Sequence, residues 1–115
     1  MLVYAIIFFA VAALGGLVLA SSVLRGKFAP WALSLLHAVL GAAGLLLVLK
    51  TLMEGEERIF TAFVILVIAA LGGFYLAFKH LKQEIAPKGL VIVHAGAAVA
   101  GFALLVTMVY IHNLT

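Results

Sequence analysis

The stretch AALGGLVLA at residues 12–20 returns 57 residues later as AALGGFYLA at residues 69–77. The same offset, without a gap, also matches a proline, a histidine and another glycine. These further matches are Ala29-Pro30 with Ala86-Pro87, His37-Ala38 with His94-Ala95, and Ala43-Gly44 with Ala100-Gly101. Alanine and leucine coincide easily in so biased a composition, but proline, histidine and paired glycines do not. The sequence therefore predicts two tandem repeats, residues 1–57 and 58–115.

The rest of the chain is apolar almost throughout, since 68% of its 115 residues are hydrophobic and only 10% are charged. A soluble domain of this length needs more polar surface. A membrane-spanning helix needs about 20 apolar residues, and four runs are long enough. They cover residues 2–24, 30–53, 59–81 and 88–111. We therefore expect one all-α transmembrane domain, residues 1–115, folded as an up-down four-helix bundle.

Each repeat in this prediction is a helical hairpin that crosses the bilayer twice, so both repeats enter the membrane in the same direction. A pseudo-two-fold axis along the membrane normal should relate them. Equivalent residues then lie at equal depth, and the second and fourth helices lie diagonally across the bundle. The first run lacks a basic leader and continues to Leu24. We expect it to be retained, because a signal peptide has a shorter apolar core.

The charged residues indicate how the bundle is oriented. Five cations flank the first and third turns, against two near the middle turn and the termini. The five are Arg25, Lys27, Lys79, Lys82 and Lys88. The positive-inside rule predicts that the first and third turns are cytoplasmic and both termini outside, in a bacterial or archaeal cytoplasmic membrane. The pI near 9.5 then reflects membrane topology and not nucleic-acid binding.

Two histidines carry the functional prediction. His37 lies seven residues after Pro30, and His94 lies seven after Pro87. At 1.5 Å per residue, both imidazoles lie roughly 10 Å inside their helices, where an ionisable side chain is a functional hypothesis by default. On diagonal helices the two rings can converge on the bundle axis. Two neutral imidazoles placed in this way can bind one metal from opposite sides.

Small residues lie on the faces that carry these histidines. Gly41 and Gly44 follow His37 by one and two helical turns, and the same steps from His94 lead to a second pair, Ala98 and Gly101. Two stripes of small residues lie on the flanking helices, namely Ala12, Gly16 and Ala20, and Ala69, Gly73 and Ala77. We expect these positions to leave room for a large planar group, with the glycine of each stripe near the level of the histidines.

These features resemble the bis-histidine haem sites of four-helix membrane cytochromes b. The resemblance covers the bundle topology and the histidines with their small neighbours. It implies that His37 and His94 are the axial iron ligands of one non-covalent haem b. From their place at the cytoplasmic rim, we expect the propionates of such a haem to meet the cations Arg25, Lys27, Lys82 and Lys88, with Trp31 as a further donor. The two other histidines, His80 and His112, form no second pair, and we expect His80 on the solvated rim beside lipid headgroups.

The role implied by the resemblance is single-electron transfer, with a quinone or other redox proteins as partners and a larger redox complex as a host. Two filled axial positions favour electron transfer over oxygen binding. The absence of cysteine excludes iron–sulfur clusters and covalent haem attachment.

Two other function classes stay open at this point. A small transporter or channel could use the histidine pair for protons or a transition metal, although no Asp or Glu lies inside a predicted span. A cofactor-free assembly subunit could use the histidines as interhelical hydrogen-bond partners and the small stripes for close helix packing. Only the cytochrome would be coloured when purified.

Overall fold

The computed structural model describes residues 1–114 and consists of four long helices. They are α1 (Leu2–Leu24), α2 (Trp31–Met53), α3 (Phe60–Leu81) and α4 (Lys88–His112), with a single 3₁₀ turn, η1 (Glu57–Ile59), before α3. The four predicted spans are confirmed to within one residue at each end. Pro30 and Pro87 stand just before α2 and α4 in extended conformation, with ψ of 123° and 125°, because proline supplies no N–H to the first turn.

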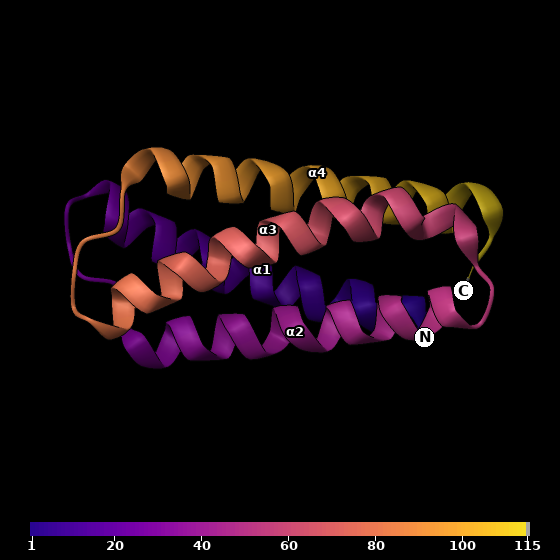
Figure 1. Cartoon of the computed structure of the whole chain (residues 1–115), viewed down its shortest axis with the longest axis horizontal. Coiled ribbons are helices and arrows are strands. Elements are labelled where there is room, and N and C mark those ends of the chain that lie inside the picture. Colours follow the sequence, from indigo (N-terminus) through magenta and orange to yellow (C-terminus); the bar gives the residue numbers. More distant parts are fainter. Residues whose placement is uncertain (115) are drawn as a thin grey trace.

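Consecutive helices run antiparallel and pack side by side (Figure 1). Helices α1 and α3 each pack against α2 and α4, whereas within residues 1–114 the backbones of neither diagonal pair come within 8 Å (Cα to Cα) of each other. The predicted all-α four-helix bundle is thus confirmed, with α2 and α4 on one diagonal. Both termini and the α2–α3 turn lie at one end of the bundle, here called the termini end. The loops after α1 and α3 lie at the other end, called the basic end for the cations beside them.

The outer surface of the bundle is apolar. Leu14 of α1 is 65% exposed, and its repeat equivalent Leu71 of α3 is 64% exposed. A soluble protein would bury such side chains, but a membrane helix turns them toward lipid. All four helices are long and apolar enough to cross a bilayer. The chain is an integral membrane protein.

Two clusters of buried side chains hold the bundle together, one at each end. At the termini end the cluster consists of Leu2, Ala5, Val48, Ile59, Ala62, Leu66, Leu105 and Val109. At the basic end it consists of Leu19, Val23, Ala29, Leu76, Ala86 and Val91. Alanines and glycines occupy the inward faces between them, so the middle of the bundle is less filled than its ends.

The helices α1 and α3 end in the same way. After α1, the N–H groups of Gly26 and Lys27 bond back to the carbonyls of Val23 and Ser22, both at 2.9 Å. This is a Schellman motif, in which the residue after the cap is left-handed. Gly26 has φ of 71°, and its repeat equivalent Gln83 has φ of 56°.

Candidate functional site

His37 of α2 and His94 of α4 come together from the two diagonal helices. Their ring centroids are 6.2 Å apart, and the ring planes are inclined at 84°. Both side chains are half-buried. The predicted convergence on the bundle axis is therefore present in the structure, at a depth between the two core clusters.

Each of these histidines is anchored to the neighbouring helix of its own hairpin. His37 Nδ1 lies 2.7 Å from the carbonyl oxygen of Ala12, and His94 Nδ1 lies 2.7 Å from that of Ala69. A carbonyl oxygen only accepts, so Nδ1 carries the hydrogen and donates it. In the neutral imidazole, Nε2 then keeps a free lone pair. Within residues 1–114, no hydrogen bond reaches Nε2 of either ring.

Gly16 and Gly73 leave room for the two imidazole rings, because they have no side chain. A Cβ on Gly16 would lie 2.9 Å from Cε1 of His37, and a Cβ on Gly73 would lie 2.9 Å from Cε1 of His94. The glycines therefore lie at the level of the histidines, as the sequence predicts. The space beside Gly16 and Gly73 is filled by the imidazoles themselves.

A cavity of about 610 Å³ adjoins the histidine pair between the two core clusters. Among the predicted site residues, His37, His94, Gly16, Gly73, Gly41 and Ala98 line it. A Cβ on Gly41 would meet no atom within 4 Å, so this glycine leaves open space. The lining toward the termini end is aromatic, because Phe9, Phe63 and Phe102 reach it. Phe9 and Phe102 pack edge to face with centroids 6.5 Å apart.

Four predicted site residues do not line this cavity. A Cβ on Gly44 would lie 2.7 Å from Phe9, and one on Gly101 would lie 2.8 Å from Leu66. Both glycines therefore admit large side chains of the neighbouring helix. The other two residues are bound locally at the basic end. Arg25 Nε donates to the Ser21 carbonyl at 3.1 Å, and Lys82 Nζ lies 4.5 Å from the centroid of the Phe78 ring.

His80 of α3 lies inside the bundle, so its expected place on the solvated rim is wrong. Its side chain is 8% exposed and lines the cavity near the basic end. Its Nδ1 lies 3.0 Å from Oγ of Ser34, which is 3% exposed, and its Nε2 is buried without a hydrogen-bond partner. A signal for this position was present in the sequence, because His80 continues the helical face of Gly73 and Leu76 at steps of three and four.

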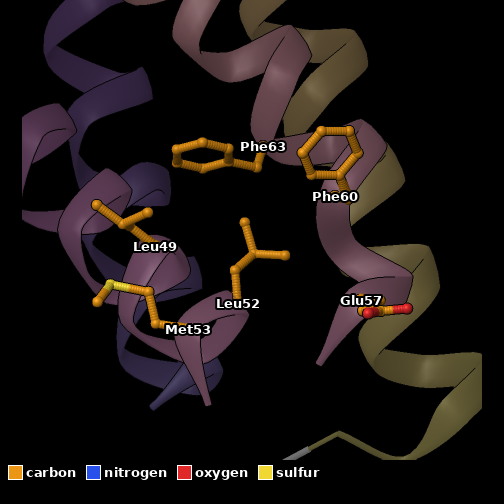
Figure 2. A pocket seen from close by; sticks show the side chains of 6 residues that line it. All are labelled: Leu49, Leu52, Met53, Glu57, Phe60 and Phe63. Atoms are coloured by element: carbon orange, nitrogen blue, oxygen red, sulfur yellow. The ribbon is translucent and has the colours of Figure 1, made fainter. Parts of the chain in front are cut away.

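A second hollow, a groove of about 600 Å³, lies between α2 and α3 at the termini end. Figure 2 shows its six lining residues: Leu49, Leu52, Met53, Glu57, Phe60 and Phe63. The Phe63 ring points toward the α2 side chains, whereas the Glu57 carboxylate points away from Leu52. Leu49 and Phe63 also line the central cavity, so these two side chains stand between the groove and the cavity.

Comparison of the chain with protein-family models, curated proteins and solved structures finds no match. Within residues 1–114, no three His, Cys, Asp or Glu side chains are grouped as a metal site. A porphyrin supplies four of its iron's ligands, so a haem needs only two from the protein, and the histidine pair offers two.

Proposed function

We propose that the chain is a membrane b-type cytochrome that carries single electrons through one non-covalent haem b held by His37 and His94. The observation that supports this most directly is the state of the two rings. Both Nδ1 atoms donate to carbonyl oxygens at 2.7 Å, and both Nε2 lone pairs stay free. Metal-binding histidines are commonly oriented in this way, with the second ring nitrogen donating to a carbonyl or carboxylate.

The separation of the rings also fits this role. An imidazole nitrogen lies about 2.0 Å from a metal that it binds, so two rings that would hold one metal together must lie close to each other. The measured separation is 6.2 Å. Two rings in direct edge-to-face contact fall in the same range. The free Nε2 atoms and the adjoining cavity favour the ligand pair.

The cavity supplies the second argument. Its volume of about 610 Å³ falls within the range of about 300–1,000 Å³ that is typical of small-molecule and cofactor sites. Its lining is apolar except at two places, the histidine pair and the pair Ser34 and His80, so it suits a largely apolar occupant with a few polar groups. Lipid chains could fill it, but they would leave both Nε2 atoms without partners.

In this proposal the protein's residues hold, orient and enclose the group. Ala12 and Ala69 orient the imidazoles, and Gly16 and Gly73 let the rings approach their own hairpins. The apolar lining excludes water. Bound haem supplies an iron that changes by one electron between its ferric and ferrous states. Because His37 and His94 would both hold the iron, electron transfer would be favoured over binding of an external ligand.

The test is the absorption spectrum of the purified chain, followed by pyridine haemochrome analysis. We expect a low-spin b-type spectrum with a sharp Soret band and a reduced α band. His37→Ala and His94→Ala should abolish it, while His112→Ala, at the end of α4, should retain it. A colourless wild-type protein after supply of haem, or retention of the bis-histidine spectrum in both alanine variants, would refute the proposal and leave the cofactor-free alternatives.

The proposal includes a lipid-soluble electron partner, a membrane quinone, that approaches through the groove between α2 and α3. The groove is lined mainly by apolar side chains, and it shares two of them, Leu49 and Phe63, with the cavity. Leu52 lines the groove but not the cavity. Leu52→Trp should therefore slow haem reduction by a quinol without slowing reduction by dithionite. Equal quinol rates in variant and wild type would instead favour a redox protein as the partner.

The proposed orientation in a bacterial or archaeal cytoplasmic membrane has the basic end in the cytoplasm and both termini outside. Arg25 and Lys27 follow the end of α1, and Lys82 follows the end of α3. Lys88 is the first residue of α4, so all four cations lie at the basic end. This clustering supports the positive-inside assignment.

A further inference from the structure

Ser34 and His80 break the internal symmetry of the cavity. The residues related to them by the repeat are Val91 and Val23. The two valines belong to the buried cluster at the basic end and also line the cavity. One side of the basic end, between α2 and α3, is therefore polar, while the equivalent side between α1 and α4 is apolar.

The remaining lining sharpens this difference. Four polar residues line the cavity: the two histidines of the pair, Ser34 and His80. All other lining residues are Ala, Gly, Val, Leu or Phe. The cavity is thus aromatic toward the termini end and polar at a single place toward the basic end. A planar guest with polar groups on one edge only would be held in one orientation.

The hydrogen-bond arrangement of the pair shows which group it lacks. His80 Nδ1 and Ser34 Oγ share one hydrogen bond at 3.0 Å, and His80 Nε2 is buried without a partner. If the Ser34 hydroxyl donates to Nδ1, then Nε2 carries the hydrogen of the neutral ring. A buried N–H donor without an acceptor is costly. An acceptor on the guest, and best of all a charged one, would remove that cost.

We propose that Ser34 and His80 bind a carboxylate on one edge of the cavity's guest, with the hydroxyl donating to Nδ1 and Nε2–H donating to the carboxylate. This inference rests on the proposed haem function and identifies the propionate anchor of that site. It assigns the role to a buried pair in the cavity and not to Arg25 and Lys82. Those two cations are held by Ser21 and Phe78 outside the cavity lining.

The test compares two guests that differ only in their carboxylates, haem b and its dimethyl ester. The full-length apoprotein in detergent is titrated with each, and the Soret band reports binding. We expect the wild type to bind the free acid about tenfold more tightly or better, because a hydrogen bond to a charged group is stronger than one to a neutral ester. The double variant Ser34→Val/His80→Val should lose this preference. The fold should tolerate this double variant, because the equivalent positions of the other repeat, Val91 and Val23, already carry valine.

Two further variants make the outcome decisive. His80→Gln keeps an N–H donor and should retain part of the preference. Arg25→Gln/Lys82→Gln should leave the preference unchanged. Loss of the preference in this rim variant, with retention in the double valine variant, would overturn the anchor and assign the propionates to the rim. Equal wild-type affinity for both guests would also overturn the anchor while the cytochrome function stands. A wild type that binds neither guest would refute both.

Discussion

Gly16 of α1 lies directly against the imidazole of His37 of α2, where even a methyl group would come within 2.9 Å of Cε1. The contact recurs between Gly73 and His94 at the same distance. Each hairpin thus holds its histidine by two means, the glycine beside the ring and the carbonyl one turn earlier that accepts from Nδ1. Because both recur, the two rings meet at equal depth.

Gly16→Ala should displace the His37 ring. Overpacking costs about 1–3 kcal/mol, against a gain of about 1 kcal/mol in helix propensity, so we expect net destabilisation and a perturbed haem spectrum. Gly72→Ala is the matched control, because its Cβ would lie 3.8 Å from His94 Cβ, an ordinary contact. Thermal unfolding in detergent and the Soret band measure the two effects. An unchanged Gly16→Ala protein would mean that the ring is not held at this glycine.

If the cavity holds the proposed haem, Gly41→Leu should fill the cavity and exclude the haem while the bundle still folds. A Cβ on Gly41 meets nothing within 4 Å, and the residue lines the cavity. Gly96→Leu is the control, because a Cβ there also meets nothing within 4 Å, while Gly96 is exposed and not part of the lining. Haem content per protein should fall in the first variant only. Equal haem content in both would place the guest elsewhere.

Gln83→Gly should stabilise the protein by about 1 kcal/mol, because a left-handed residue with a Cβ costs about 1–2 kcal/mol. Gln83 has φ of 56°, and its repeat equivalent Gly26 has φ of 71°. The converse substitution, Gly26→Gln, should destabilise by a similar amount. Unfolding equilibria of the two variants test the pair together, and effects of the same sign would contradict the shared helix-ending motif.

Glu56 should titrate far below an ordinary glutamate. Hydrogen bonds from the Arg58 guanidinium, the nearer at 2.7 Å, lower the pKa of its carboxyl to about 2. A carboxyl whose pKa is depressed on folding stabilises the fold above its unfolded pKa of about 4.5, and this stabilisation is lost as the pH falls toward 2. NMR titration of the side-chain carboxyl carbon measures the pKa, and Arg58→Gln should raise it. A wild-type value near 4.5 would show that the ion pair does not persist in solution.

The orientation can be tested with single cysteines, since the chain has none of its own. A membrane-impermeant thiol reagent applied to intact cells should label a cysteine at Glu54, in the α2–α3 turn, and not one at Gly26, in the α1–α2 loop. The physical reason is the excess of cations at the basic end, which are retained on the cytoplasmic side. The reverse labelling pattern would invert the proposed topology.

Several features of the site could be predicted because they depend on positions along a helix. The offset between the repeats places the histidines at equal depth, and two crossings per repeat place α2 and α4 on one diagonal. Gly41 and Ala98 follow the histidines by one turn and line the cavity as expected. Gly44 and Gly101, one turn further, do not, because Phe9 and Leu66 of neighbouring helices occupy the space beside them.

The position of His80 shows why other features were missed. The flanking Lys79 and Lys82 indicate a membrane rim, but His80 shares a face with Leu76 and is turned inward against Ser34. The acceptors for His37 and His94 were missed for a similar reason. They are backbone carbonyls, and no side-chain pattern marks which carbonyl of a neighbouring helix comes within reach of a ring.

The amino-acid sequence by itself determined the four spans, the duplication and the excess of positive charge at one end. These features depend on local signals: the length of each apolar run, the prolines and glycines at the turns, and the charged residues. In lipid, each helix must also make its backbone hydrogen bonds within itself. Only the tertiary structure decided which glycines receive a ring or a phenyl group, which carbonyls accept from the histidines, and where a cavity remains. Those outcomes depend on how closely neighbouring helices approach, and that distance is set by side chains from both partners at once.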